Sequence, residues 1–177
     1  MNQREGLPQH LFEYVSSITP LLNVDVLVCD TDFNFLLTWR HDSTYGPAWH
    51  VPGGIVRFKE SILSRIHHVC SKEIGIDSLS NIRPLEINQI MNPTRDYRGH
   101  FVSILFLATV PNLHMDISHP TSQGSSNGER ACFAESPINI LPQHRRYLAS
   151  LNNLPSCSIF KSGNLLDEYS EFSEFNY

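Results

Sequence analysis

Residues 49–76, WHVPGGIVRFKESILSRIHHVCSKEIGI, are the most informative part of this chain. The segment begins with a short apolar run that a Pro-Gly-Gly turn interrupts, and it continues with apolar residues at helical spacing, such as Ile62, Ile66 and Val69. Gly75 follows as the expected helix C-cap, because glycine readily adopts the left-handed backbone conformation needed there. The segment therefore predicts a strand broken by a glycine turn and then a helix over residues 59–74.

The sequence on either side of this segment predicts four further strands and two further helices. The strands are rich in β-branched and aliphatic residues and are bounded by turn residues. We expect strands at residues 21–30, 33–40, 86–91 and 101–110, and helices at residues 9–17 and 140–151, whereas residues 93–100 have turn composition and residues 118–128 have loop composition. Strands around one central helix favour a mixed α/β (α+β) sandwich over a βαβ array.

Length and composition indicate one compact domain with a short tail. The chain has 177 residues, of which 41% are hydrophobic and only 18% charged, which argues against a wholly disordered chain. We expect a single domain over residues 1–160. Residues 161–177 interleave acids with aromatics and carry one lysine against four acids, a net charge of −3. This tail would be disordered or would pack in a dimer, and we assign it no chemistry.

Charge, cysteines and hydropathy narrow the class of protein further. The net charge of −5 argues against a basic nucleic-acid footprint. The four cysteines show no CxxC spacing, so structural zinc and a disulfide framework are not expected. The first ten residues contain no apolar signal region, and the longest apolar run, near residues 101–110, is too short for a bilayer. We therefore expect a cytoplasmic protein that binds neither nucleic acid nor membrane.

Five residues of the segment 49–76 fall at the spacing of a known signature. Gly54, Glu60, Glu73, Gly75 and Ile76 match the glycine, the first glutamate and the last three anchors of the Nudix box. The chain thus resembles the Nudix hydrolase family. That resemblance implies an α/β/α sandwich with a mixed sheet, and hydrolysis of a nucleoside diphosphate derivative with Mg²⁺ or Mn²⁺. In the family Glu60 supports the loop, so its expected role is structural, as are those of Gly54 and Gly75.

The box is degenerate in its helical part. The family pattern of an arginine and three carboxylates aligns with residues 68–73, HVCSKE, which places His68 at the arginine position and Val69 and Lys72 at two carboxylate positions. Glu73 is the carboxylate that remains. Mg²⁺ commonly binds through one or two carboxylates together with substrate phosphates and waters. A single substrate-assisted metal site is therefore expected rather than a multi-metal site.

Further matches resemble one branch of the family, the GDP-mannose mannosyl hydrolases. They comprise TPL at residues 19–21, VDV at 24–26, FLLTWR at 35–40, WHVPGG at 49–54 and RGHFV at 98–102. The branch attacks the anomeric carbon of the sugar with water and releases nucleoside diphosphate. The resemblance implies metal binding by the Gly53 carbonyl and by Glu73, which makes Glu73 the main catalytic candidate. It also implies substrate contacts from Asp25 and Arg40. We add Arg98 as a diphosphate ligand and expect a homodimer.

Two correspondences with that branch fail. A tyrosine of the branch is Phe101 here, and a late Gln-His pair that supplies a metal ligand and general base aligns with residues 127–128, Asn-Gly. Glu129 is the nearest side chain able to ligate metal or accept a proton, and it is the second catalytic candidate, with His119 further up the loop. The sequence therefore does not decide which residue is the general base.

Other interpretations also remain open. Lys72 is either a solvated residue or a phosphate-facing cation, and Trp49 and His50 either line a pocket or belong to the core. The turn RDYRG at residues 95–99 also resembles Nudix proteins that hydrolyse ADP-ribose, which makes pyrophosphate cleavage a rival reaction. Loss of the carboxylates favours a third possibility, a domain that binds a nucleotide sugar without hydrolysing it.

Overall fold

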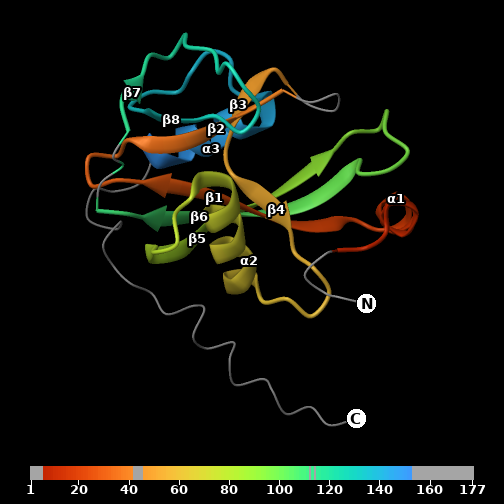
Figure 1. Cartoon of the computed structure of the whole chain (residues 1–177). Coiled ribbons are helices and arrows are strands. Elements are labelled where there is room, and N and C mark those ends of the chain that lie inside the picture. Colours follow the sequence, from red (N-terminus) through yellow and green to blue (C-terminus); the bar gives the residue numbers. More distant parts are fainter. Residues whose placement is uncertain (1–5, 42–45, 112, 114, 153–177) are drawn as a thin grey trace, which may run out of the picture.

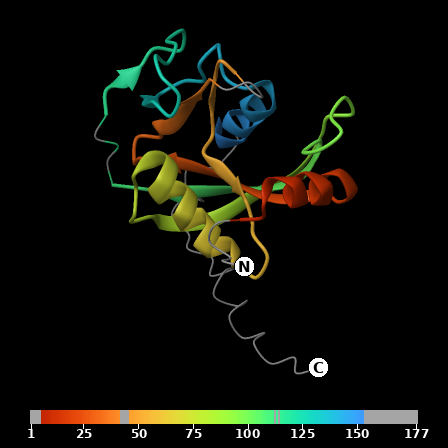
Figure 2. The same ribbon diagram turned by 45° about the vertical axis from the view of Figure 1, so that its right-hand side comes forward.

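The computed structural model describes residues 6–41, 46–111, 113 and 115–152. Within these residues a mixed sheet lies between α2 on one face and α3 on the other (Figures 1 and 2). The helices are α1 Gln9–Ile18, α2 Ile62–Val69 and α3 Pro142–Asn152, and a π-helical turn η1, Cys70–Ile74, continues α2. The strands are β1 Leu21–Cys29, β2 Phe35–Arg40, β3 Ala48–His50, β4 Gly53–Ile55, β5 Ser80–Met91, β6 His100–Thr109, β7 Ile117–Ser118 and β8 Arg130–Phe133.

Strand β1 builds both halves of the core, because successive side chains of a strand point to opposite faces of the sheet. On one face Val24 and Val26 pack in the same buried cluster as Ile66 and Val69 of α2. On the other face Leu27 belongs to a second cluster. That cluster also contains Trp49, Phe133, Tyr147 and Leu148. The expected α/β/α sandwich with a mixed sheet is therefore confirmed.

The pairing of β1 opens the sheet on one side. Its neighbour β6 runs parallel to it along its whole length, from Leu21 to Cys29. On the opposite edge β1 pairs with β2 only near Cys29, whereas residues 23–25 pair with β4. Strand β3 in turn pairs with β2. The sheet therefore divides between β2 and β4, and polar side chains of β2 together with the glycine backbone of β4 line the space that this division leaves.

The predicted interrupted strand and helix of residues 49–76 are present, but only Val51 and Pro52 separate β3 from β4, and both glycines of the expected turn lie in β4, where they pair with β1. The helix begins at Ile62 rather than near residue 59, because the Ser61 hydroxyl caps it by accepting a hydrogen bond from the Ser64 backbone N–H. Gly75 ends the helical segment with a φ of 68°, as its sequence position predicts.

The other predicted helices and strands have the predicted type, but their first or last residues differ from those predicted. Strand β5 begins at Ser80, six residues before the expected strand, and the late helix begins at Pro142. Strand β8 was missed because its four residues carry no alternation that marks a strand. The tail over residues 161–177 lies outside the described residues. Within the described part of the chain, no helix combines the length and apolarity needed to cross a membrane.

Candidate active site

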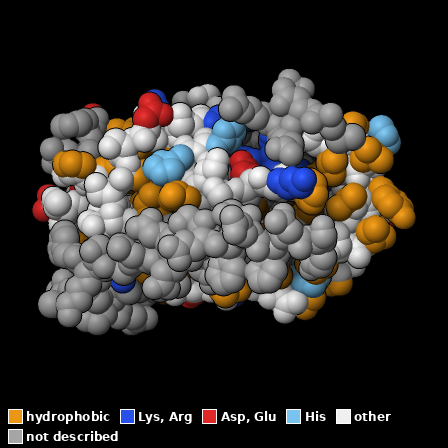
Figure 3. Space-filling model, turned by 90° about the horizontal axis from the view of Figure 1, so that it is seen from below, with side chains coloured by type: hydrophobic (Ala, Val, Ile, Leu, Met, Phe, Trp, Pro, Cys, Tyr) orange, Lys and Arg blue, Asp and Glu red, His pale blue; other side chains and the backbone are white. Residues whose placement is uncertain are grey.

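A cavity of about 520 Å³ lies where β1 changes its partner from β2 to β4. Side chains and backbone from six strands, β1 to β6, and from η1 and α3 contribute to its wall. Its polar lining residues are Asn23, Asp25, Thr38, Arg40, His50, Gly53, Gly54, Lys72, Glu73, Arg98, Asn127, Gly128, Gln143 and His144. Figure 3 shows one face of the molecule on which acidic, basic and histidine side chains lie next to one another. The division of the sheet thus produces a polar cavity in an otherwise apolar core.

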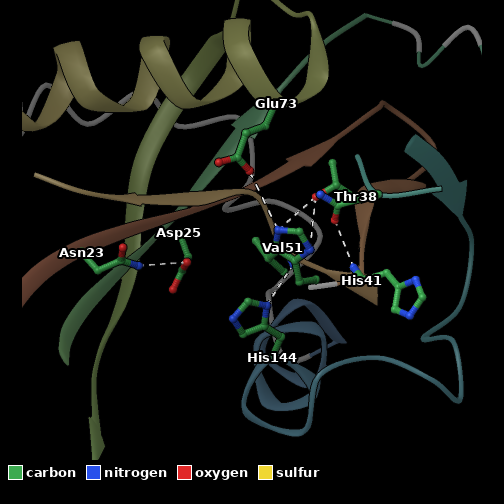
Figure 4. A network of polar contacts seen from close by, with 9 residues as sticks. Asn23, Asp25, Thr38, His41, Val51, Glu73 and His144 are labelled. Carbon is green, nitrogen blue, oxygen red and sulfur yellow. Dashed lines mark hydrogen bonds and ion pairs between the residues drawn. The ribbon is translucent and has the colours of Figure 1, made fainter. Parts of the chain in front are cut away.

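Glu73 enters this cavity from the π-helical turn at the end of α2 (Figure 4). Burial raises the pKa of its carboxyl to about 7, although a backbone hydrogen bond from Gly53 and the charge of Arg40 both lower it. Lys72, the preceding residue, also lines the cavity but is exposed. The wide π turn therefore brings adjacent residues of opposite charge to the same opening, where an anionic ligand bound with a cation would meet both.

Gly53 lies beside both Asp25 and Glu73. It pairs with Asp25 in the antiparallel ladder, while the adjacent Pro52 carbonyl accepts the Val26 N–H. Since main-chain groups alternate sides along an antiparallel strand, the N–H and C=O of Gly53 point away from β1, and the N–H donates to the Glu73 carboxylate. A Cβ at residue 53 would overlap the Asp25 carboxylate, so only glycine fits.

Asp25 is buried, with 4% of its surface exposed, and accepts hydrogen bonds from three side chains. Asn23 donates to Oδ1 at 3.0 Å (Figure 4), and Ser103 and Tyr147 donate to Oδ2 at 2.5 Å and 2.9 Å. Burial raises the pKa of Asp25, and these three hydrogen bonds lower it. The network holds the carboxylate in one orientation at the wall of the cavity.

Two histidines meet at the cavity from distant parts of the chain. His144 of α3 accepts the Val51 backbone N–H at Nδ1, at 2.9 Å, so its Nε2 carries the proton of the neutral ring (Figure 4). Burial lowers the pKa of His144 to about 3. The ring of His50 lies 6.2 Å from that of His144, and burial lowers the pKa of His50 to about 4. Both rings are therefore neutral at pH 7.

The basic side chains of the cavity suit an anionic ligand. Arg40, at the end of β2, lines the cavity and lowers the pKa of both His50 and Glu73. Arg98 comes from the loop between β5 and β6 with a φ of 53°, and its guanidinium lies 5.6 Å from the centroid of the Phe12 ring. Lys72 completes a set of three cations around the opening. The structure thus brings Arg40, Arg98, Asp25, Gly53 and Glu73 together.

Glu60 and Gly54 support the loop rather than facing the ligand space through a side chain. The Glu60 carboxylate accepts the Arg57 backbone N–H at 2.9 Å and pairs with the Arg65 guanidinium at 2.6 Å. At Gly54 a Cβ would lie 3.0 Å from the Val69 side chain, so the loop packs tightly on α2. These contacts join the start and the middle of the helix to the glycine turn.

Glu129 is placed differently from the other sequence candidates. Its carboxylate accepts hydrogen bonds from the Ser125 backbone N–H and hydroxyl in an exposed turn, and the residue is not among those lining the cavity. These bonds lower the pKa of Glu129. The neighbours Asn127 and Gly128 do line the cavity, as does Phe101. The structure therefore gives Glu129 no place beside Glu73.

The donor set fits one divalent cation that shares its shell with a ligand. Glu73 supplies a carboxylate, and the Gly53 carbonyl faces the same side. Among the described residues no group of three or more His, Cys, Asp and Glu side chains could hold a metal ion. A cation at Glu73 would therefore complete its shell with main-chain oxygen, water and substrate phosphate, as Mg²⁺ commonly does.

Sequence reasoning missed several residues of the site. Gln143 and His144 form a Gln-His pair on α3, whereas alignment placed the corresponding pair of the branch at residues 127–128. Tyr147 and Ser103 hold Asp25 from α3 and β6. Their spacing from residues 49–76 carries no signal, since only the folded sheet brings α3 to β1. The Gln-His dipeptide at residues 143–144 is visible in the sequence, but the sequence does not show that it lines the cavity.

Comparison with known proteins supports the fold independently of these side chains. No protein-family model matches the chain. Among curated proteins, it is 29% identical over 119 residues to the low-salt glycan biosynthesis protein Agl8 of Haloferax volcanii, covering 64% of this chain and 75% of that protein.

Solved structures match more completely at low identity. A MutT Nudix hydrolase from Burkholderia pseudomallei superposes with a TM-score of 0.59 at 19% identity, covering 75% of this chain and 98% of that one. The Nudix domain of NrtR from Shewanella oneidensis, solved with ADP-ribose, superposes with a TM-score of 0.56 at 18% identity, covering 86% and 98%. A Nudix hydrolase from Nitrosomonas europaea gives 0.57 at 15% identity, covering 76% and 90%. With its mixed sheet, glycine turn and α2–η1 segment, the chain has the Nudix fold.

Proposed function

We propose that this protein is a hydrolase that uses a divalent cation, Mg²⁺ or Mn²⁺, to cleave a nucleoside diphosphate sugar. The observation that carries the proposal is that Glu73 and Gly53 line one cavity together with Arg40, Lys72 and Arg98. A diphosphate carries negative charge that both a cation at Glu73 and these side chains would bind. The name of the Haloferax relative, a glycan biosynthesis protein, supports a sugar-containing substrate.

Each residue has a separate role in this proposal. Glu73 and the Gly53 carbonyl hold the cation, which would neutralise the diphosphate and make it a better leaving group. Arg40 and Arg98 bind the diphosphate oxygens, and Lys72 binds them at the opening. Asp25 accepts a hydrogen bond from a hydroxyl of the sugar or from the base, because its oxygens are held at the cavity wall by Asn23 and Tyr147.

We further propose a substrate resembling GDP-mannose and cleavage at carbon. Water would attack the anomeric carbon, the bond from that carbon to the diphosphate oxygen would break, and free sugar and nucleoside diphosphate would leave. The support is the resemblance of residues 19–54 and 98–102 to that branch. We also propose that the protein acts as a homodimer, which light scattering after gel filtration would test.

Phosphorus NMR of the protein with Mg²⁺ and a panel of GDP-, UDP-, dTDP- and ADP-sugars tests the activity. We expect consumption of one class with growth of a terminal phosphate resonance of the nucleoside diphosphate. The matched control is Glu73→Gln, which keeps the side-chain shape and removes the charge. If no member of the panel is consumed by the folded wild-type protein, the hydrolase proposal is wrong.

Pyrophosphate cleavage of ADP-ribose or a related compound is the second candidate. Arg98, in the turn over residues 95–99 that resembles ADP-ribose hydrolases, lies at the cavity. The Shewanella Nudix domain was solved with ADP-ribose. Hydrolysis in ¹⁸O-water separates the reactions: label on the released sugar means attack at carbon, and label on a phosphate means attack at phosphorus.

A binding domain without hydrolysis is the third candidate, since Val69 and Lys72 replace two carboxylates of the box. Val69, the last residue of α2, is buried in the core and does not line the cavity. A nucleotide sugar that raises the melting temperature without being consumed would support this version. Turnover that disappears in Glu73→Gln, with the fold intact, would exclude it.

A further inference from the structure

His50 stands beside the proposed cation site in a way that the family resemblance does not explain. Its Nε2 lies 3.9 Å from Oε2 of Glu73, and both side chains line the cavity. The exposed fractions of the two side chains are 15% and 32%, so both are partly shielded from water. An imidazole nitrogen and a carboxylate oxygen therefore converge on one small space.

The separation of these atoms suits two ligands of one ion. With metal–ligand distances of about 2.1 Å, two donors lie about 3 Å apart when adjacent and about 4.2 Å apart when opposite. The observed 3.9 Å falls between these limits and exceeds a direct hydrogen bond. A cation between His50 and Glu73 would therefore be within ligand distance of both without moving the backbone.

Thr38 supplies the second contact that a metal-binding histidine usually makes. Its hydroxyl lies 3.3 Å from Nδ1 of His50 and 3.1 Å from Nε2, on the adjacent strand β2. The hydroxyl is closer to Nε2 than to Nδ1, so a cation at Nε2 requires the hydroxyl to accept the Nδ1 proton instead, which leaves the Nε2 lone pair for the cation. Ligating histidines commonly donate their other ring nitrogen in this way, which fixes the tautomer and the ring orientation.

We propose that His50 is a metal ligand that replaces the lost carboxylates of the helix, so that the site binds Mn²⁺ and similar transition ions in preference to Mg²⁺. Imidazole suits transition metals, whereas Mg²⁺ favours oxygen ligands. The ligand set is Glu73, the Gly53 carbonyl and His50, completed by water or phosphate. This inference rests on the proposed cation site but not on any particular substrate.

Pulsed electron paramagnetic resonance of Mn²⁺ bound to the full, tag-free chain tests the proposal directly. Coordinated imidazole produces a ¹⁴N modulation of the Mn²⁺ echo. We expect this modulation in wild type and its loss in His50→Leu, a non-ligating residue of similar bulk. His68→Ala is the matched control, because His68 is an exposed histidine on α2. It should keep the modulation.

Titration calorimetry of the same proteins gives the affinities. His50→Leu should weaken Mn²⁺ binding by about tenfold or more but Mg²⁺ binding by less than about threefold, because Mg²⁺ depends less on the nitrogen. Thr38→Val, which keeps the shape but removes the hydroxyl, should weaken Mn²⁺ binding by about tenfold. Circular dichroism confirms that each variant is folded, and His50→Asn replaces His50→Leu if the latter is not.

The outcomes separate this inference from the proposed function. Wild-type protein that binds no Mn²⁺, or that shows no ¹⁴N modulation, overturns the role of His50 even if nucleotide sugars are hydrolysed with Mg²⁺. Modulation that survives in His50→Leu and disappears in His144→Gln also overturns it. Modulation that depends on His50 supports the inference even if no substrate of the panel is consumed.

Discussion

At the scale of single residues, the cavity depends on polar groups that burial keeps in defined states. Glu73 is a partly buried acid whose nearest cations are Arg40, at the end of β2, and Lys72, at the opening. His144 is a buried base held neutral, because its Nδ1 already accepts the Val51 N–H. Glu73 and His144 thus line the same cavity, and burial shifts the pKa of each toward the uncharged form.

Glu73→Gln should reduce hydrolysis by at least about a hundredfold. Loss of a side chain that only orients a metal ligand reduces metal affinity or activity by about 10- to 100-fold, and loss of the ligand itself should cost at least as much. The melting temperature should be unchanged or higher, because the amide keeps the volume and removes a buried charge. Phosphorus NMR rates and thermal unfolding measure the two effects. A variant with wild-type turnover would remove Glu73 from the mechanism.

His144 should make the metal-free protein sensitive to acid. Its pKa falls from an ordinary value of about 6.5 to about 3 on folding, so folding favours the neutral form. This contribution to stability is fully present above pH 6.5 and is lost as the pH falls toward 3. Denaturant unfolding at a series of pH values should show a shallower loss of stability in His144→Gln. An identical slope in both proteins would contradict the assignment.

At the scale of elements, the strand, glycine turn and helix of residues 49–76 form one unit. Ser61 caps α2, and Glu60 ties the turn to the helix through Arg57 and Arg65. The π turn η1 then directs Glu73 toward Gly53. The position of Glu73, the proposed metal ligand, therefore depends on contacts of Glu60 and Ser61, which lie more than ten residues before it in the sequence.

Glu60→Gln should destabilise the fold by about 3 kcal/mol, because the guanidinium of Arg65, a residue with 5% of its surface exposed, loses its anionic partner. The double variant Glu60→Gln/Arg65→Met should recover most of this loss, since no buried charge then remains. Urea unfolding measures both. Glu13→Gln is the control, because the hydrogen bond between Glu13 and Gln9 is exposed, and it should change stability by less than about 0.5 kcal/mol.

At the scale of the whole molecule, the division of the sheet between β2 and β4 places a cavity between the two core clusters. The net charge of −5 gave no hint of its character, because the tail over residues 161–177 carries −3 of it. The cavity instead gathers Arg40, Lys72 and Arg98. Exposed hydrophobic side chains outside the cavity include Tyr14 and Ile18 on α1 as well as Phe58, Ile87 and Ile138.

Cysteine labelling should report unfolding of the whole domain. Cys29, Cys70 and Cys132 are free and buried in the core, and burial raises the pKa of Cys70 to about 12 and that of Cys132 to about 11. In a Cys157→Ser variant, a thiol reagent should therefore react only as fast as the protein opens. A bound nucleotide sugar with Mn²⁺ should slow the reaction further. Rapid labelling of one thiol in the folded protein would show that its surroundings open locally.

Much of the site was predictable from the sequence, because the glycine turn and helix are local structures. The spacing of Gly54, Glu60, Glu73 and Gly75 follows from one strand, one turn and one helix, each set by neighbouring residues. The same spacing marked Val69 and Lys72 as departures, and the structure places one in the core and the other at the opening. Positions that depend on local geometry could therefore be predicted from the sequence, whereas the roles of these residues stay predictions.

The sequence by itself determined the class of fold, the α2–η1 segment and the residues that a cation would meet first. Only the tertiary structure decided what surrounds them: His50 beside Glu73, Thr38 beside His50, and Tyr147 on Asp25. The physical reason is that these contacts join β1, β2, β3 and α3 across a divided sheet. Periodicity describes one element at a time, whereas the cavity exists only where several elements meet.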